Sequence, residues 1–534
     1  MKWIATLALA LSMSTVQGQW TEDTGVNTPA GSDPSTIIRA MAASDGSTFI
    51  AFWRVAPAPT NMELRLQKLG VDGVPLFGAD GIVVSADIAM STFTVLATAE
   101  IDAEDNVYIG VTATEGELGH VFKLDAEGNH LWPSGGVTFS GGYGITIEPL
   151  STGEALVAWL NVPNGLMQKY GADGTPIWSE PVPLVSGTSK TAPEALFELS
   201  TGGYTVLFHT YNFGISSTLW AQGYDVDGNE TWAAPVQLSD KTTVWNTTYS
   251  SAQVGDVVYF GYMAATGLRF DSFLQRINPD GVLPWGINGS DFDTNETDYE
   301  MNTRIALDED AGVAYALCNY KDPAQVDNGE RIQRFDLVSG DRQLTDHGKV
   351  IYPIGSHTVH ASDLHLAGGQ PLFLLELGYD NGATPTTLHA VLLDAEGVFV
   401  WPEEMRPMGT FEASKSRTHM TAPVAGQSVA AWVETKESSP MIYAQNLSDA
   451  GLTGVAEAVS AVGPSLRAFP NPVSQALRIE GCPAGSRVEI RDAQGRSVLK
   501  TRLTEGSLNT SGLAPGCYTL CLEGRSGRLR FVKQ

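Results

Sequence analysis

Residues 167–186 read MQKYGADGTPIWSEPVPLVS, and similar stretches recur along the body of the chain. Residues 66–85 (LQKLGVDGVPLFGADGIVVS) and 221–240 (AQGYDVDGNETWAAPVQLSD) show the pattern clearly: an apolar run, an Asp-Gly turn and a large apolar residue four positions after the glycine. The turn glycines of the successive copies are Gly73, Gly128, Gly174, Gly228, Gly281, Gly340, Gly397 and Gly451. Eight copies of roughly 54 residues predict a repeat architecture, because one ordinary core would not serve a chain of this length.

Each copy contains four short runs typical of β-strands, separated by turns rich in Gly and Asp. In the first copy the runs are 36–43, 48–55, 63–69 and one that begins at Ile82. The second run is the most apolar in every copy, as expected for a strand that is covered on both faces. We therefore predict an all-β fold, a β-propeller of about eight four-stranded blades. Seven blades and an open β solenoid are the alternatives.

The N-terminal stretch WTEDTGV, residues 20–26, resembles the end of a repeat. Trp20 stands in the position of the large apolar residue, and the last copy is weakest at that same point, where Val455 stands. We therefore predict that the N-terminal segment completes the last blade and closes the ring.

Charge is distributed unevenly along the chain. In total, 60 Asp and Glu against 32 Lys and Arg give a formal net charge of −28, which disfavours nucleic acids and anionic lipid surfaces as partners. From residue 465 onward the balance reverses, with 11 basic and 5 acidic residues. Such a change of sign along a chain predicts a domain boundary.

The first residues predict a secretory signal peptide that is removed to leave Gln19 at the new N-terminus. Lys2 precedes an apolar run from Trp3 to Met13, and small residues lead to the cleavage point after Gly18. This run is shorter than the roughly 20 residues of a membrane span, and no later segment reaches that length. The expected parts are the signal peptide at 1–18, the propeller at 19–454, a linker at 455–467 and a second domain at 468–534.

Residues 468–534 predict a small antiparallel β domain, which we expect to be a β-sandwich. Its ordered motifs are Pro470, Asn471, Pro472, Asp492, Gly495, Arg496, Pro515, Gly516, Tyr518 and Lys533. With these motifs the segment resembles the type A C-terminal sorting domain of the bacterial type IX secretion system. The resemblance implies recognition by the type IX machinery, passage through the outer membrane, and a product either anchored to surface lipopolysaccharide or released.

Three of the four cysteines, Cys482, Cys517 and Cys521, lie in this second domain, and Cys318 lies in the body. Four residues along a strand separate Cys517 from Cys521 by about 13 Å at ~3.3 Å per residue, which is too far for a disulfide. Cys482 pairs with one of them, or all three are buried thiols.

One set of charged residues breaks the repeat at comparable depths of the first strand of each copy. These residues are Arg39, Glu194, Arg304, His360, Arg417 and His419. In a propeller the first strand of a blade lines the central channel, whose mouth is a usual ligand site. We therefore predict that they ring the channel mouth and bind an anionic or sugar-like group. Solvated strand ends are the alternative.

Oxygen-bearing side chains follow one another closely between residues 291 and 298. Asp291, Asp293, Asn295 and Asp298 suit Ca²⁺, which prefers oxygen ligands. The segment lacks the glycine of a calcium loop, so a solvated acidic loop is the alternative. Calcium is a possible cofactor, and no other cofactor is predicted.

Catalytic motifs are absent from the sequence, which contains no Ser/His/Asp signature, phosphate loop or paired metal signature. The Asp-box turn of sialidases should recur from blade to blade, and the nearest string, at residues 44–49, has the wrong spacing. We therefore expect an exported binding or adhesion protein for a glycan or protein ligand, secreted or attached to the cell surface. The alternative is a secreted propeller hydrolase or lyase acting on polysaccharide, which requires two carboxylates about 5–9.5 Å apart in one pocket.

Overall fold

The computed structural model divides into two compact units, Met1–Val455 and Ala456–Gln534. The predicted signal peptide, 1–18, and nearly all of the predicted linker lie outside the described residues. No helix occurs in the part of the chain that the structure describes. The described residues are 20–31, 34–57, 61–88, 97–113, 118–187, 189–211, 217–244, 249–378, 385–436, 439–449, 467–469, 473–480, 487–491, 497–503, 507–522 and 528–534.

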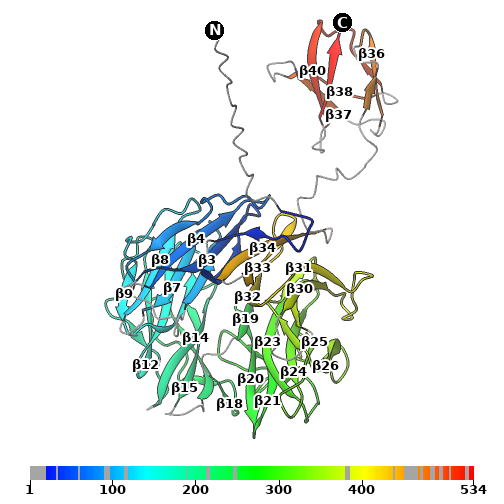
Figure 1. Cartoon of the computed structure of the whole chain (residues 1–534). Coiled ribbons are helices and arrows are strands. Elements are labelled where there is room, and N and C mark those ends of the chain that lie inside the picture. Colours follow the sequence, from blue (N-terminus) through cyan, green and yellow to red (C-terminus); the bar gives the residue numbers. More distant parts are fainter. Residues whose placement is uncertain are drawn as a thin grey trace, which may run out of the picture. The chain divides into compact units, whose positions relative to one another are not determined.

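The first unit is a ring of antiparallel blades in which consecutive strands pair along the chain. Figure 1 shows the blades following one another around a centre, from β3 and β4 through β20 and β21 to β33 and β34. Blades 1 to 4 comprise β2 (Ser35–Ala42), β3 (Thr48–Val55), β4 (Met62–Leu69), β5 (Ile82–Ser85); β6 (Ala97–Ile101), β7 (Val107–Thr112), β8 (Leu118–Leu124), β9 (Val137–Ser140); β10 (Tyr143–Pro149), β11 (Ala155–Asn161), β12 (Asn164–Tyr170), β13 (Val182–Pro183); and β14 (Lys190–Glu198), β15 (Tyr204–Tyr211), β16 (Ser217–Tyr224), β17 (Val236–Gln237).

The second half of the ring repeats this order, with a short strand that joins blades 4 and 5 into one sheet, β18 (Thr242–Thr243). Blades 5 to 8 comprise β19 (Ser250–Val254), β20 (Val257–Thr266), β21 (Arg269–Ile277), β22 (Ser290–Asp291); β23 (Tyr299–Asp308), β24 (Val313–Lys321), β25 (Asn328–Asp336), β26 (Lys349–Gly355); β27 (Thr358–Ala361) with β28 (His365–Ala367), β29 (Gln370–Gly378), β30 (Thr386–Leu392), β31 (Met405–Ala413); and β32 (Lys415–Met420), β33 (Gln427–Lys436), β34 (Ser439–Ser448). The predicted eight-bladed all-β propeller is confirmed.

The N-terminal segment closes the ring, as the sequence predicted. β1 (Thr28–Pro29) pairs antiparallel with β34, with Thr28 opposite Ala444, and so becomes the fourth strand of blade 8. Trp20 packs into the core shared by blades 8 and 1, and its Nε1 donates to the carbonyl of Val71 at 2.9 Å. The two ends of the repeat are therefore held together by main-chain pairing and by a buried aromatic side chain.

The seams between blades explain why the glycine and the large apolar residue recur in the repeat. The Trp132 indole of blade 2 is buried and donates to the carbonyl of Ala172, in the turn of blade 3, at 3.1 Å. Gly174 in this turn has φ +84, and a Cβ there would lie 2.9 Å from the Trp132 ring, so a side chain would be strained and would clash. The same indole-to-turn hydrogen bond recurs for Trp178 with Val226, Trp232 with Pro279 and Trp285 with Val338.

The repeated glutamine of the third strand fixes the connection to the fourth. The amide of Gln67 donates to the carbonyl of Gly78 at 2.7 Å, and its oxygen accepts from the Lys68 main chain at 3.0 Å. Gln168, Gln222, Gln275, Gln333 and Gln445 also donate to main-chain carbonyls. This side chain therefore satisfies backbone groups at a place where the ladder ends.

The second unit holds two small sheets around a core of its own. Leu477, Ile479, Val488, Ile490 and Leu520 are among the side chains buried in this core, as expected for a sandwich. One sheet has the order β35 (Arg467–Phe469), β36 (Ala476–Glu480), β39 (Ser507–Asn509), and the other the order β38 (Ser497–Arg502), β37 (Arg487–Arg491), β40 (Gly516–Leu522), β41 (Arg528–Lys533).

Candidate functional site

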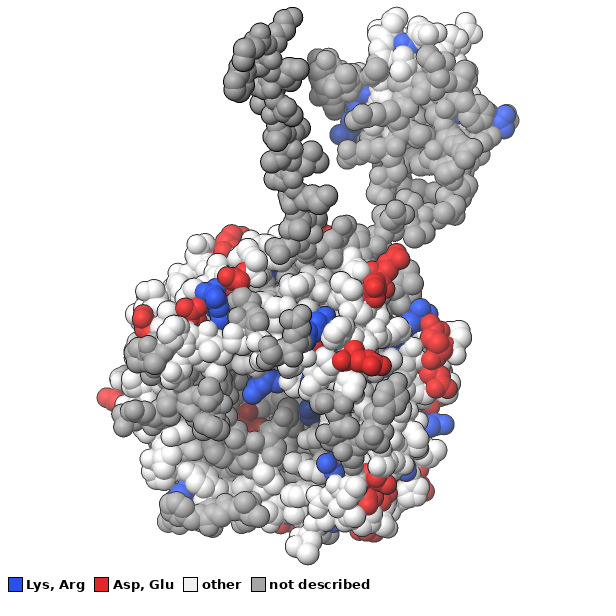
Figure 2. Space-filling model, viewed as in Figure 1, with Lys and Arg blue, Asp and Glu red and all other residues white. Residues whose placement is uncertain are grey.

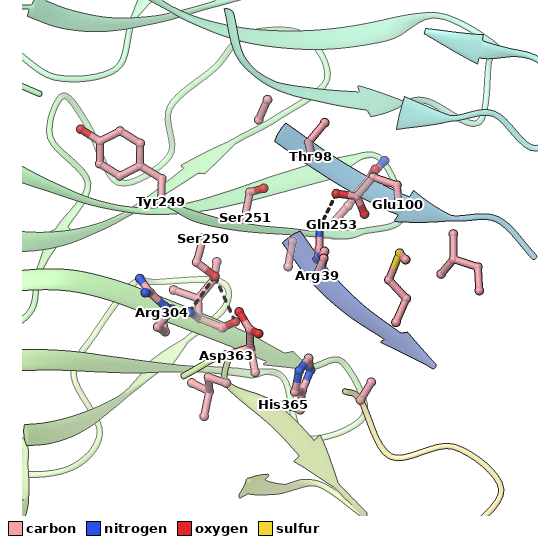
Figure 3. A pocket seen from close by; sticks show the side chains of 18 of the residues that line it. Arg39, Thr98, Glu100, Tyr249, Ser250, Ser251, Gln253, Arg304, Asp363 and His365 are labelled. Carbon is pink, nitrogen blue, oxygen red and sulfur yellow. Dashed lines mark hydrogen bonds and ion pairs between the residues drawn. The ribbon is translucent and has the colours of Figure 1, made fainter. Parts of the chain in front are cut away.

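A pocket of about 880 Å³ lies at the centre of the ring, where the inner strands of all eight blades meet. Its lining comes from β2, β6, β10, β14, β19, β23, the segment of β28 and the end of β32. Figure 2 shows that the face in view is hollowed near its centre, with Lys or Arg side chains beside the hollow. Figure 3 shows that charged, hydroxyl and aliphatic side chains from different blades point into the pocket.

Bulges in the inner strands set the direction of the side chains that reach the pocket. In blade 4 the pairing moves from Pro193–Phe208 to Ala195–Leu207, so Glu194 is an extra residue without a partner on β15. A bulged residue bends its strand and re-aims its side chain. Similar register shifts occur between Ile37 and Arg39, Tyr143 and Thr146, Met301 and Arg304, and Ser416 and His419.

Three of the residues that the sequence singled out, Arg39, Glu194 and Arg304, line the pocket. Arg39 on β2 forms an ion pair with Glu100 on β6 and donates to the carbonyl of Ala99 at 3.2 Å, as Figure 3 shows. The negative charge of Glu100 raises the pKa of Arg39, against the effect of burial. This ion pair therefore ties the inner strands of blades 1 and 2 together beside the pocket.

The other three, His360, Arg417 and His419, are not in the pocket lining. His360 is exposed on β27, opposite Glu376. Arg417 is also exposed, with a φ of +50 in the bulge of β32. His419 contacts the pocket indirectly, because its Nδ1 lies 3.3 Å from Oδ2 of Asp363, which does line the pocket.

A buried histidine, His209, contacts the carboxyl group of Glu194. Oε2 of Glu194 lies 3.1 Å from Nε2 of His209, a side chain with no exposed surface. The Nδ1 of His209 lies 3.0 Å from the hydroxyl of Thr243 and 3.2 Å from that of Ser217. This row of polar groups runs from the pocket wall into the junction between blades 4 and 5.

Two carboxyl groups that sequence reasoning missed, Glu100 and Glu148, also line the pocket. Burial, followed by the charge of Glu100, raises the pKa of Glu148 to about 8. Burial also raises the pKa of Glu100, and the guanidinium of Arg39 opposes this rise. The signal was present in the sequence, because Glu100 and Glu148 stand two residues after Thr98 and Thr146, and residues two apart share one face of a strand.

Asp363 and His365 were not among the residues predicted to ring the channel, and they follow a break in the inner strand of blade 7. Asp363 stands between β27 and β28, and His365 begins β28. Burial acts to raise the pKa of Asp363. The hydrogen bond and charge of His419, and to a smaller extent the charges of Arg39 and His365, outweigh burial and lower that pKa well below its usual range. The imidazole of His365 lies 2.7 Å, through Nε2, from the carbonyl of Met420, and burial lowers its pKa. Asp363 therefore stays ionised more readily than Glu100 and Glu148, whose pKa values are raised.

The four predicted calcium ligands make different contacts within the protein. Asp293 is buried and accepts from the Tyr320 hydroxyl, whereas the amide of Asn295 donates to Asp298 at 2.7 Å. Burial raises the pKa of Asp291 to about 6. Within the described residues, no group of three or more His, Cys, Asp or Glu side chains is placed to hold a metal ion. Calcium binding stays a prediction.

The motifs of the second unit are described only in part. Pro515, Gly516, Tyr518 and Lys533 belong to or adjoin β40 and β41, and the Tyr518 hydroxyl donates to the carbonyl of Ala514 at 2.8 Å. The remaining predicted motif residues, Pro470, Asn471, Pro472, Asp492, Gly495 and Arg496, lie outside the described residues. So does Cys482, and the side chains of Cys517 and Cys521 are not described. Cys318 is a buried thiol.

Taken with its two sheets, the second unit identifies how the chain leaves the cell. Residues 467–533 match the family model described as the secretion system C-terminal sorting domain. The chain is therefore a β-propeller joined to a sorting domain of the type IX secretion system, and the protein is secreted or attached to the cell surface. In the described part of the chain, no helix has the length and apolar character needed to cross a membrane.

Solved structures with a similar path of the chain are distant in sequence. The Dos1 propeller is 10% identical, with a TM-score of 0.46 over 80% of this chain and 95% of that chain. Prolyl oligopeptidase B from Galerina marginata is 12% identical (TM-score 0.41, 75% of this chain), and the match spans 55% of its length. The β-propeller domain of the Trilobed protease from Pyrococcus furiosus is 9% identical (TM-score 0.38), with 71% of this chain and 96% of that chain covered. Among curated proteins, none matches the sequence.

Proposed function

We propose that the propeller is the binding module of an exported protein, and that its central pocket receives part of an extracellular glycan or protein. The supporting observation is that inner strands of all eight blades converge on one pocket of about 880 Å³. This volume is within the range of ligand sites, roughly 300–1,000 Å³. Hydroxyl and amide groups of Thr98, Ser251 and Gln253 stand beside charged and aliphatic groups in its lining, a mixture that suits a polar ligand.

A pocket-filling substitution tests this proposal. Ser251 lines the pocket and is exposed, so Ser251→Trp should occupy the space without disturbing a core. Ser179→Trp, at an exposed loop position outside the pocket lining, is the matched control. Glycan and peptide arrays should show ligands that bind the parent protein and the Ser179→Trp control and are lost by Ser251→Trp. Identical array profiles for the two variants would refute the proposal.

The finer route of export is also a proposal. It comprises removal of a signal peptide at 1–18, engagement of the type IX machinery by the C-terminal domain, and anchoring of the product at the outer membrane. Deletion of residues 465–534 should leave the protein inside the outer membrane, which fractionation of the producing cell measures. Undiminished surface display of the deleted form would contradict this route.

The two carboxyl groups with opposite pKa shifts favour a second candidate, a hydrolase or lyase acting on polysaccharide. Burial and the charge of Glu100 raise the pKa of Glu148 to about 8, whereas His419 helps to lower that of Asp363 despite burial. Environments that push two carboxyl pKa values apart are typical of an acid and base pair. Glu148→Gln should then abolish release of sugar ends from a polysaccharide panel, while Glu127→Gln, in an exposed turn, should keep it. A panel that the parent protein leaves intact would remove this candidate.

A further inference from the structure

The charged side chains of the central pocket are unequal in number. Two guanidinium groups and four carboxyl groups line it: Arg39, Arg304, Glu100, Glu148, Glu194 and Asp363. Arg39 and Glu100 are paired with each other, so neither adds much attraction for a ligand, and three carboxyl groups remain with the one guanidinium group of Arg304. The excess of carboxyl groups makes this pocket better suited to a cationic group than to the anionic group expected from the sequence.

A buried polar cluster lies next to Glu194. The Ser217 hydroxyl donates to the main-chain carbonyl of Thr243 at 2.8 Å, and the Thr243 hydroxyl lies 3.0 Å from Nδ1 of His209. On the other side of the ring, Nε2 of His209 lies 3.1 Å from the Glu194 carboxylate. His209 therefore contacts Glu194 through Nε2 and the buried hydroxyl groups through Nδ1.

Aliphatic side chains also line the pocket. They are Ile101, Ile145, Ile147, Leu196, Leu307 and Leu366. Lysine and arginine carry a charged head on a chain of three or four methylene groups, and the chain packs well on apolar surface while the head stays among polar groups. A lining that contains both carboxyl and aliphatic groups matches both parts of such a side chain.

We propose that the central pocket binds the side chain of a lysine or arginine in a basic peptide segment of an extracellular partner. This inference rests on the proposed function and names the ligand class of the same pocket. The formal charge of −28 on the chain would draw basic segments toward it. Burial and then the charges of Glu100 on β6 and Glu198 on β14 raise the pKa of Glu148, so a cation that enters should also displace its proton.

Three blocked, fluorescein-labelled peptides test the charge preference directly: Gly-Gly-Lys-Gly-Gly and its analogues with norleucine or glutamate in the centre. Fluorescence anisotropy with the purified full chain measures their affinities. The lysine peptide should bind more tightly than both analogues. It should also bind about tenfold more tightly at pH 9 than at pH 7, since Glu148 loses its proton in this interval while lysine keeps its charge. Equal or tighter binding of either analogue would overturn the inference.

Variants separate this inference from the function on which it rests. Glu148→Gln should weaken binding of the lysine peptide and remove its pH dependence, while Glu127→Gln should leave both unchanged. If array ligands are lost by Ser251→Trp but the lysine peptide does not bind, the inference is wrong and the proposed function stands. If Ser251→Trp changes no binding at all, both are wrong.

Discussion

At the seams between blades one contact recurs around the ring, whereas around the central pocket the blades contribute different side chains. Trp132, Trp178, Trp232 and Trp285 each donate to the turn of the next blade. In the pocket, the corresponding inner strands present Arg39, Thr98, Glu194 or Arg304. The residues that repeat from blade to blade therefore hold neighbouring blades together, whereas the residues that differ between blades form the pocket. Seam substitutions should therefore cost stability, and some pocket substitutions should increase it.

The largest expected effect is at a seam. Trp132→Ala removes a buried indole that packs on Tyr170 and donates to Ala172, so the free energy of unfolding should fall by about 3–5 kcal/mol. Urea denaturation measures this loss. Leu131→Ala, at the adjacent residue, which is 41% exposed, should change it by less than about 0.5 kcal/mol. Similar losses for the two variants would show that the indole does not hold the seam.

A second seam substitution distinguishes the destabilisation caused by a steric clash with the tryptophan from that caused by backbone strain. Gly174→Ala places a Cβ 2.9 Å from the Trp132 ring at φ +84, so it should lower the free energy of unfolding by about 2–4 kcal/mol. Gly153→Ala has nearly the same φ, +79, with open space around the new Cβ, and should cost only about 1–2 kcal/mol. Equal costs in denaturation curves would mean that contact with the tryptophan contributes nothing.

The seams could be predicted from the sequence because they repeat. The turn glycine and the large apolar residue four positions later are visible without a structure, and the match of Trp20 to that pattern predicted how the ring closes. These contacts need one residue type at one place in each blade, so alignment of the copies recovers them.

The pocket could be predicted only in part, because the residues that the sequence singled out stand at different places relative to a bulge. In blades 1, 4, 6 and 8 the inner strand has one residue more than its partner across the bulge: Arg39, Arg304 and His419 are the first paired residues after it, whereas Glu194 and Arg417 lie within it. Side chains within and after a bulge point in different directions, and the alignment that found Arg39 also selected the exposed Arg417. Glu100 and Glu148 were missed because the sequence comparison covered only one depth of the first strand in each copy.

Removing a pocket carboxyl group should raise the free energy of unfolding, whereas a seam substitution should lower it. The pKa of Glu148, raised to about 8 by burial and by the charge of Glu100, exceeds the value of about 4.3 expected in the unfolded chain. Between these pH values the folded chain holds a proton that the unfolded chain has lost, so the free energy of unfolding falls as pH rises. Glu148→Gln should therefore stabilise the protein at pH 9 by roughly 1–3 kcal/mol, allowing for solvent screening.

Parallel denaturation at pH 5 and pH 9 checks this prediction. The difference in stability between the two pH values should shrink in Glu148→Gln and stay as in the parent protein for Glu127→Gln. A loss of stability at pH 9 in Glu148→Gln would show that the ionised carboxylate is stabilised by groups in the pocket, and the contrast between seam and pocket would not hold at this residue.

The smallest effect is expected at Arg417, which is exposed in the bulge of β32 and absent from the pocket lining. Arg417→Ala should change the free energy of unfolding by less than about 0.5 kcal/mol, and Arg417→Gly should be no less stable, since φ is +50. Affinity for the lysine peptide should not change in Arg417→Ala, but should rise in Arg304→Ala because a like charge leaves the pocket. If both alanine variants shift that affinity equally, the site extends to the channel mouth, and the bulges do not separate the two arginines.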